Sequence, residues 1–204
     1  MMFIGTTNTD KVAEIGGLLQ SLGVVLTPVA LNVPEIYDTF KDNSTLKAME
    51  YAKHVGGVCI SEDSGLEVQA LNNMPGPWSA RYYHHNNPDL FDPNLSRKQI
   101  DDLNNKLVLK QMLGEENRTA RFVIYLTVAS PDRVLFQNFA YYQGYIAQEE
   151  KGSNGFGYDP IFIGHDTYGK TLAELDSVRK NIKSHRKMVL DSLYAWASEN
   201  PSLL

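Results

Sequence analysis

The sequence predicts an α/β fold with a mixed β-sheet flanked by helices. Helix-like and strand-like segments alternate over the first 68 residues. Two β-rich runs, 119–130 and 134–148, are separated only by the turn residues 131–133. Alternation favours parallel strands and a hairpin is antiparallel, so the sheet should contain both. No repeat or linker divides the chain, and residues 1–204 are expected to form a single domain.

The first half supplies three strands and two helices. Strands are expected at 2–5, 24–31 and 58–68, the last being one strand or two joined at its acids. Residues 12–23 carry apolar side chains at helical spacing and end at a glycine. A second helix is expected over 42–57, which closes with a glycine pair. Pro28 places the second strand at an edge or a bulge of the sheet.

The second half is less regular. A turn is expected at 72–77 and an irregular polar segment at 79–94, followed by a helix over 96–113. The glycine-rich run 151–164 should form a loop that leads into a short strand. A final helix is expected to begin near Ser177 and to run to 197.

Composition limits the classes of function. The net charge of −5 argues against a nonspecific nucleic-acid binder, which normally has a basic face, but leaves a single nucleotide as a ligand. A single cysteine, Cys59, cannot form a disulfide within the chain, which suits a reducing compartment. Cys59 lies in an apolar run and is expected to be a small core residue. No membrane-spanning segment or signal peptide is expected, which makes a cytoplasmic location the default.

The segment "GTTNTDK" (5–11) is a candidate anion site. A strand that enters a polar turn and then a helix directs free backbone N–H groups at one point. Hydroxyl and amide side chains and one lysine would add donors there. The residues concerned are Thr6, Thr7, Asn8, Thr9, Asp10 and Lys11. Ordinary helix capping would explain the same residues, and the spacing of a Walker A motif is absent.

The acids of "SEDSGLEV" (61–68) are a candidate metal site. Glu62 and Asp63, with Glu35 upstream, could supply the oxygen ligands that Mg²⁺ prefers. A carboxylate at such a place could also orient or deprotonate water. The alternative is a tight polar turn between two strands.

Two later segments could contact a base. In "GSNGFGYDP" (152–160), Phe156 and Tyr158 offer faces for stacking, unless both aromatic rings pack onto the body of the protein. In "KNIKSHRKM" (180–188), the basic residues could form a solvated helix face, while His185 and Arg186 could face a cleft.

Together, these segments resemble the inosine triphosphate pyrophosphatase family. The motifs that match, in the family's order, are "TTNTDKVAEI", "FKDNSTLKA", "EDSGLEVQALNNMPGPWSARY", "GFGYDPIF", "GKTLAEL" and "KSHR". The resemblance runs from about Met2 to the last helix. It implies an elongated mixed sheet with two lobes around a central cleft. It also implies a homodimer and Mg²⁺-dependent hydrolysis of ITP, dITP and XTP to the monophosphate and pyrophosphate.

The resemblance also implies roles for individual residues. Phosphate binding falls on Thr6 to Lys11, metal binding on Glu35, and both catalysis and metal binding on Asp63. Substrate contacts fall on Ser64, on Lys180 and, as a further phosphate contact, on Lys47. The segment that encloses the base is Phe156, Gly157, Tyr158 and Asp159, and the pair that reads the base is His185 and Arg186. Glu62 is expected to support the metal directly or through water.

The sequence departs from the family pattern at a few places. Thr7 replaces a frequent glycine, Glu62 the usual aspartate and Asp42 the usual glutamate, and Lys183 stands at a usually apolar position. The longer Glu62 changes the side chain beside the metal, and the stretch 84–96 has no clear counterpart. A pyrophosphatase for pyrimidine or modified nucleotides, or a nucleotide sensor without turnover, would use a similar phosphate site.

Overall fold

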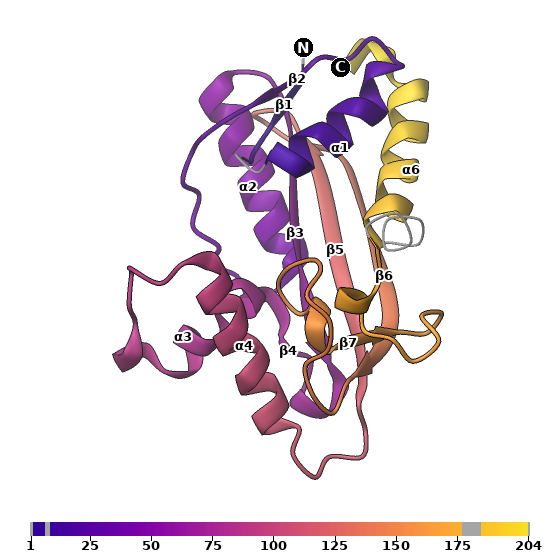
Figure 1. Cartoon of the computed structure of the whole chain (residues 1–204). Helices are drawn as coiled ribbons and strands as arrows, with labels where there is room; N and C mark the ends of the chain where they lie inside the picture. The colour runs from indigo at the N-terminus through magenta and orange to yellow at the C-terminus, as the bar shows by residue number, and fades with distance from the viewer. Residues whose placement is uncertain (1, 7–8, 177–184, 204) are drawn as a thin grey trace. The chain divides into compact units, whose positions relative to one another are not determined.

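The structure is a computed structural model that describes residues 2–6, 9–176 and 185–203, with only the backbone described for 9–11, 13, 14 and 185. Within these residues the strands form one seven-stranded sheet in the order β2-β1-β3-β5-β6-β7, with β4 paired to β3 (Figure 1). The strands are β1 (Met2–Ile4), β2 (Leu26–Pro28), β3 (Val58–Val68), β4 (Met74–Pro75), β5 (Thr119–Ala129), β6 (Val134–Ile146) and β7 (Phe162–Gly164). Because β1 is parallel to β2 and β3 while β7 is antiparallel to β6, the expected mixed sheet is confirmed.

Two of the longer helices begin at recognisable capping residues. The described α-helices are α1 (Thr9–Gln20), α2 (Phe40–Val55), α3 (Tyr82–Asn86), α4 (Arg97–Gln111) and α6 (His185–Glu199). Thr39 caps α2 by accepting a hydrogen bond from the Asp42 amide, and Gly56 ends it at φ 64°. Ser96 caps α4 in a capping box with Gln99.

The chain divides into two compact units. Unit 1 comprises Met1–Asp63, Ile124–Ala140 and His185–Leu204, and unit 2 comprises Ser64–Val123 and Tyr141–Ser184. The strands β3, β5 and β6 therefore each contribute residues to both units.

In unit 1, helices cover both faces of the strands. Ile4 and Ile60 pack in an apolar cluster that includes side chains of α1 and α6. Phe3 and Cys59, their neighbours along the strands, pack instead with Tyr51 of α2. Cys59 is buried, as expected, and burial raises the pKa of its thiol to about 12. Side chains alternate between the two faces of β3, so the position of a residue along the strand determines which helices its side chain can contact.

In unit 2, the core joins α4 to the strands. Val108 of α4 and Met112, which follows this helix, cluster with Leu66 of β3 and Phe162 of β7. The approach of β7 to β6 is close at Gly144, where a Cβ atom would lie 2.3 Å from the carbonyl oxygen of Ile163. Only glycine fits this position without movement of the backbone.

Several element boundaries differ from the sequence expectation for local reasons. β2 is shorter than 24–31, because the Val24 amide still bonds to Leu19 in the turn that ends α1 and Pro28 stands at the end of an edge strand. The segment 79–94, expected to be irregular, contains the short helix α3, which the buried Tyr82 begins. β3 is one continuous strand. The expected start of the last helix at Ser177 lies outside the described residues.

Candidate active site

Glu62 and Asp63 lie within β3, and their side chains serve opposite faces of the strand. Consecutive residues of a strand point to opposite sides. Asp63 accordingly accepts a hydrogen bond from Lys47 of α2, whereas Glu62 accepts hydrogen bonds from Arg186 of α6. Both carboxylates are buried. Because β3 continues through them, the two acids do not form the polar turn that was the alternative explanation.

Lys47 joins Asp63 to Glu35. Its Nζ atom lies 2.6 Å from Glu35 Oε1 and 3.4 Å from Asp63 Oδ1. The Lys47 side chain is 13% exposed, so this ion pair is largely shielded from water. Glu35 comes from the irregular segment before α2, Lys47 from α2 and Asp63 from β3. Three separate parts of unit 1 therefore meet around one ammonium group.

Burial and charge set the protonation of this group. Burial raises the pKa of Asp63, Lys47 lowers it and the charge of Glu35 raises it, and together these effects leave the pKa at about 6. Burial lowers the pKa of Lys47, but the charges of Asp63 and Glu35 outweigh that effect and leave the pKa above its ordinary value. The site thus holds a firmly protonated lysine beside a carboxyl group that titrates near neutrality.

Asn43 fixes the segment that carries Glu35. Its Oδ1 accepts a hydrogen bond from the Tyr37 amide and its Nδ2 donates to the Tyr37 carbonyl, both at 2.9 Å. A hydrogen bond from the Asn43 side chain also favours the charged form of Asp63. Asn43 is fully buried in the first turns of α2. The sequence offered only its place in the segment "FKDN", and no role had been expected for it.

Arg186 is held by Glu62 in the first turn of α6. Its Nη1 lies 2.9 Å from Oε1 and 3.1 Å from Oε2 of Glu62. Both side chains are mostly buried. The structure therefore brings together Glu62 and Arg186, which were expected to serve the metal and the base respectively. The side chain of His185, expected to act with Arg186, is not described.

The glycine-rich loop belongs to unit 2 and is anchored on α4. The Gly157 amide donates to Asp101 Oδ2 and its carbonyl accepts from Asn105 Nδ2, each at 3.0 Å. Asp101 and Asn105 are buried and stand four residues apart on one side of α4. No role had been predicted from the sequence for either residue. Two polar residues four positions apart on the buried side of a helix are nevertheless a pattern that could have indicated them.

The two aromatic residues of this loop differ in accessibility. Phe156 is 71% exposed, and its amide donates to Asp159 Oδ2. Tyr158 is buried, and its hydroxyl donates to the Ser79 carbonyl at 2.8 Å. Phe156 can therefore offer a ring face to a ligand, whereas Tyr158 packs into the core of unit 2 as a support for the loop.

The expected phosphate segment is described only in part. Thr6 follows β1 and its amide donates to the Ile4 carbonyl, and α1 begins at Thr9, so a strand does lead into a helix N-terminus here. Thr7, Asn8 and Lys180 lie outside the described residues. The side chains of Thr9, Asp10 and Lys11 are likewise not described. Ser64 follows Asp63 in β3 and begins unit 2.

Comparison with known proteins places this arrangement in a family. The model of the Ham1 family matches residues 2–196. The chain belongs to the Ham1 family. A dITP/XTP pyrophosphatase of an Exiguobacterium species is 38% identical over 199 residues, which are 95% of each chain. A dITP/XTP pyrophosphatase of Streptococcus thermophilus is 36% identical over 208 residues, but this chain spans only 61% of its length.

Solved structures agree with the assignment to the Ham1 family. A HAM1 protein from Coxiella burnetii has a TM-score of 0.85 and 30% identity, covering 97% of this chain and 98% of that one. The family resemblance and the α/β fold with a mixed sheet are thereby confirmed.

The candidate metal site has two acidic side chains, Glu35 and Asp63. Across residues 2–6, 9–176 and 185–203, no three His, Cys, Asp or Glu side chains converge as a metal centre. Glu35 and Asp63 nevertheless already share one cation, the ammonium of Lys47. Two hard oxygen donors around a positive charge match the ligand chemistry of Mg²⁺.

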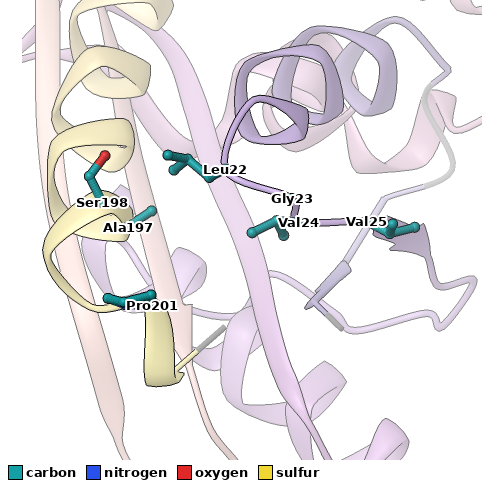
Figure 2. A pocket seen from close by; sticks show the side chains of 7 residues that line it. All are labelled: Leu22, Gly23, Val24, Val25, Ala197, Ser198 and Pro201. Atoms are coloured by element: carbon teal, nitrogen blue, oxygen red, sulfur yellow. The ribbon is translucent and has the colours of Figure 1, made fainter.

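A pocket of about 360 Å³ lies elsewhere in unit 1, near the ends of α1 and α6. Figure 2 shows the side chains of Leu22, Val24 and Val25 on one side and those of Ala197, Ser198 and Pro201 on the other. The lining holds no ionisable group and none of the candidate residues. The pocket therefore offers no cationic side chain to a phosphate ligand. In the parts of the chain that are described, no helix has the length and apolar character needed to cross a membrane.

Proposed function

We propose that this chain is a nucleoside-triphosphate pyrophosphatase that hydrolyses ITP, dITP and XTP to the monophosphate and pyrophosphate. Its membership of the Ham1 family and its full-length similarity to a dITP/XTP pyrophosphatase support this reaction. The observation that carries the proposal is the buried Asp63, which Lys47 and Glu35 surround and whose pKa is about 6. Removal of such noncanonical purines from the nucleotide pool would be its cellular role.

Asp63 acts on water in this proposal. Without metal, burial raises the pKa of the Asp63 carboxyl group to about 6, so at neutral pH the group is mostly ionised and can accept a hydrogen bond or a proton from water. Asp63 then orients or deprotonates the water that attacks the α-phosphorus, and pyrophosphate leaves. No nucleophilic serine or cysteine is needed, because phosphoryl transfer depends mainly on positioning and charge. Lys11, Lys180 and the backbone of 6–9 are proposed to hold the leaving pyrophosphate.

Mg²⁺ is proposed as the cofactor, with Glu35 and Asp63 as its protein ligands. When bound, it supplies positive charge to the phosphate oxygens as negative charge develops there. Direct metal contact by Glu62 stays a prediction, and the present partner of Glu62 is Arg186.

Arg186 is proposed to read the base. Hypoxanthine and xanthine present a 6-keto acceptor, and adenine presents a 6-amino donor. The guanidinium group of Arg186 offers only donors, so it satisfies the keto oxygen and opposes the amino group. Because Glu62 binds Nη1 with both oxygens, the guanidinium is already oriented before a nucleotide enters. The exposed ring of Phe156 is proposed to stack on the base.

A second copy of the chain is the proposed partner. Phe139, Tyr141 and Tyr145 alternate along one side of β6 and are all exposed. Exposed aromatic residues gathered in this way are typical of protein interfaces. Sedimentation velocity of the wild type and of Tyr145→Glu tests this: a dimer that becomes a monomer is expected. The single buried cysteine and the charge of −5 support a cytoplasmic location and a partner that is not nucleic acid.

Product analysis tests the proposed reaction. The protein is incubated with ITP, XTP, GTP, ATP and dTTP, with Mg²⁺ or with EDTA, and monophosphate, pyrophosphate and phosphate are resolved. We expect IMP and pyrophosphate from ITP in Mg²⁺ only, and loss of turnover in Asp63→Asn. Asp102→Asn removes an exposed acid of α4 and is the matched control. Turnover of dTTP alone would favour a pyrimidine enzyme, and binding without turnover would favour a sensor.

A further inference from the structure

Lys47 occupies the place between Glu35 and Asp63 that a metal ion would require. Its Nζ atom contacts one oxygen of each carboxylate, at 2.6 and 3.4 Å. A divalent cation bound by Glu35 and Asp63 needs oxygens of these same two groups. One mostly buried pair of acids thus faces two candidate cations.

The charges explain why a lysine stands there. Glu35 and Asp63 come from separate segments, and two like charges brought together in a mostly buried place repel each other. The ammonium of Lys47 supplies the compensating charge from within the chain. With Lys47 present the three groups carry a formal charge of −1, and without it −2. A cation that arrives alone therefore meets a carboxylate pair that is already partly neutralised.

The triphosphate can change this balance. Lysine has a long flexible stem and a compact charge that pairs readily with phosphate oxygens. Phosphates that bind nearby offer Lys47 a new partner. The carboxylates are then left to the metal that arrives with the nucleotide.

We propose that Lys47 is a displaceable internal cation, which holds the Glu35 and Asp63 carboxylates in the absence of substrate and transfers to the phosphates when metal and nucleotide bind together. The proposal rests on the proposed function, because it takes Glu35 and Asp63 as the metal ligands. It makes metal binding conditional on the nucleotide. Free metal ions then bind weakly, and the loaded site forms only with substrate present.

A fixed structural ion pair would behave in the opposite way. If Lys47 only kept the two carboxylates in position, its removal would disorder them and weaken metal binding. If Lys47 competes with the metal, its removal strengthens binding of the metal alone. The sign of the change in affinity separates the two roles.

The experiment measures Mn²⁺ binding in the absence of nucleotide. The electron paramagnetic resonance signal of free Mn²⁺ reports how much metal remains unbound. The variants are Lys47→Met, which keeps the stem and removes the charge, and Lys47→Arg, which keeps a charge. Lys53→Met is the matched control, since Lys53 lies on the same helix in an exposed pair with Glu50. Asp63→Asn identifies the site. Each titration is repeated with α,β-methylene-dITP, which cannot be cleaved between the α and β phosphates.

The expected result is a gain of about tenfold in Mn²⁺ affinity for Lys47→Met without nucleotide, within the range of about 5- to 150-fold that is usual for coupled sites. Lys47→Arg and Lys53→Met should stay near the wild type. The increase in Mn²⁺ affinity that the nucleotide analogue causes should be smaller in Lys47→Met than in the wild type. Circular dichroism checks that each variant is folded, and Lys47→Gln replaces Lys47→Met if the latter is not.

Two failures can be told apart. Equal or weaker Mn²⁺ binding in Lys47→Met, with binding still lost in Asp63→Asn, overturns the role of Lys47 and leaves the metal site in place. Failure of the wild type to bind Mn²⁺ even with the analogue, or full binding in Asp63→Asn, overturns the proposed metal site and the inference with it.

Discussion

Replacement of Asp63 by asparagine should increase stability while it abolishes turnover. Burial raises the pKa of Asp63 from 3.8 to about 6 in the folded protein. The folded state therefore binds a proton more tightly than the unfolded chain. This contribution to stability is complete below about pH 4 and is lost as the pH rises through about 6. A shift of about 2 units at about 1.4 kcal/mol each makes the charged carboxylate cost about 3 kcal/mol at pH 7.5.

Urea unfolding in EDTA measures this cost. Asparagine resembles the protonated acid and carries no charge, so Asp63→Asn should exceed the wild type by up to about 3 kcal/mol at pH 7.5. The difference should shrink below pH 6 and disappear near pH 4. Asp102→Asn, which removes an exposed ion pair with Lys98, should change stability by less than about 0.5 kcal/mol. The reasoning would be refuted if Asp63→Asn were less stable than the wild type at pH 7.5. It would also be refuted if the difference in stability between the two proteins were the same at pH 7.5 and near pH 4.

Three other substitutions test the supports of the site. Glu62→Gln should weaken the hold on Arg186 and lower the ratio of kcat/KM for ITP over ATP; an unchanged ratio would remove Glu62 from base selection. Asn43→Ala should lose two hydrogen bonds to the Tyr37 backbone, lower the free energy of unfolding by about 2 kcal/mol and reduce kcat. Full activity in a folded Asn43→Ala protein would contradict its role in placing the active-site segment. Gly144→Ala should force β6 and β7 apart, cost about 1–3 kcal/mol in urea unfolding and leave KM for ITP unchanged; wild-type stability would show that the strands adjust freely.

The fold class could be predicted because local patterns carry it. Apolar spacing marked the helices, and the short turn 131–133 marked the hairpin. Boundaries were predicted less accurately where a neighbouring element determines them. The strand β2 begins later than expected, because the Val24 amide bonds to Leu19 in the turn that ends α1. The short helix α3 begins at Tyr82, whose burial no local pattern reveals.

The residues of the candidate site could be predicted from the sequence, but which of them form ion pairs with one another could not. Asp63 and Glu35 were expected to lie near a cation, and Lys47 was expected only to contact phosphate. Their meeting depends on how α2 lies on β3, which is a tertiary fact. The accessibility of an aromatic ring in a loop is similarly invisible, so Phe156 and Tyr158 read alike in the sequence and differ in the structure.

The alternation of side chains along β3 also limits which mutations this segment can accept. Glu62 and Asp63 are neighbours in sequence, yet α6 holds one and α2 the other. On the proposed role of Arg186, exchange of the residue at 62 would alter base selection while the acid of the adjacent codon stays in place. Loss of a single codon between 58 and 61 would instead turn both side chains to the wrong helix, because a shift of one residue reverses every position in a strand. Substitution at 62 therefore keeps the alternation of this strand intact, whereas a change in its length does not.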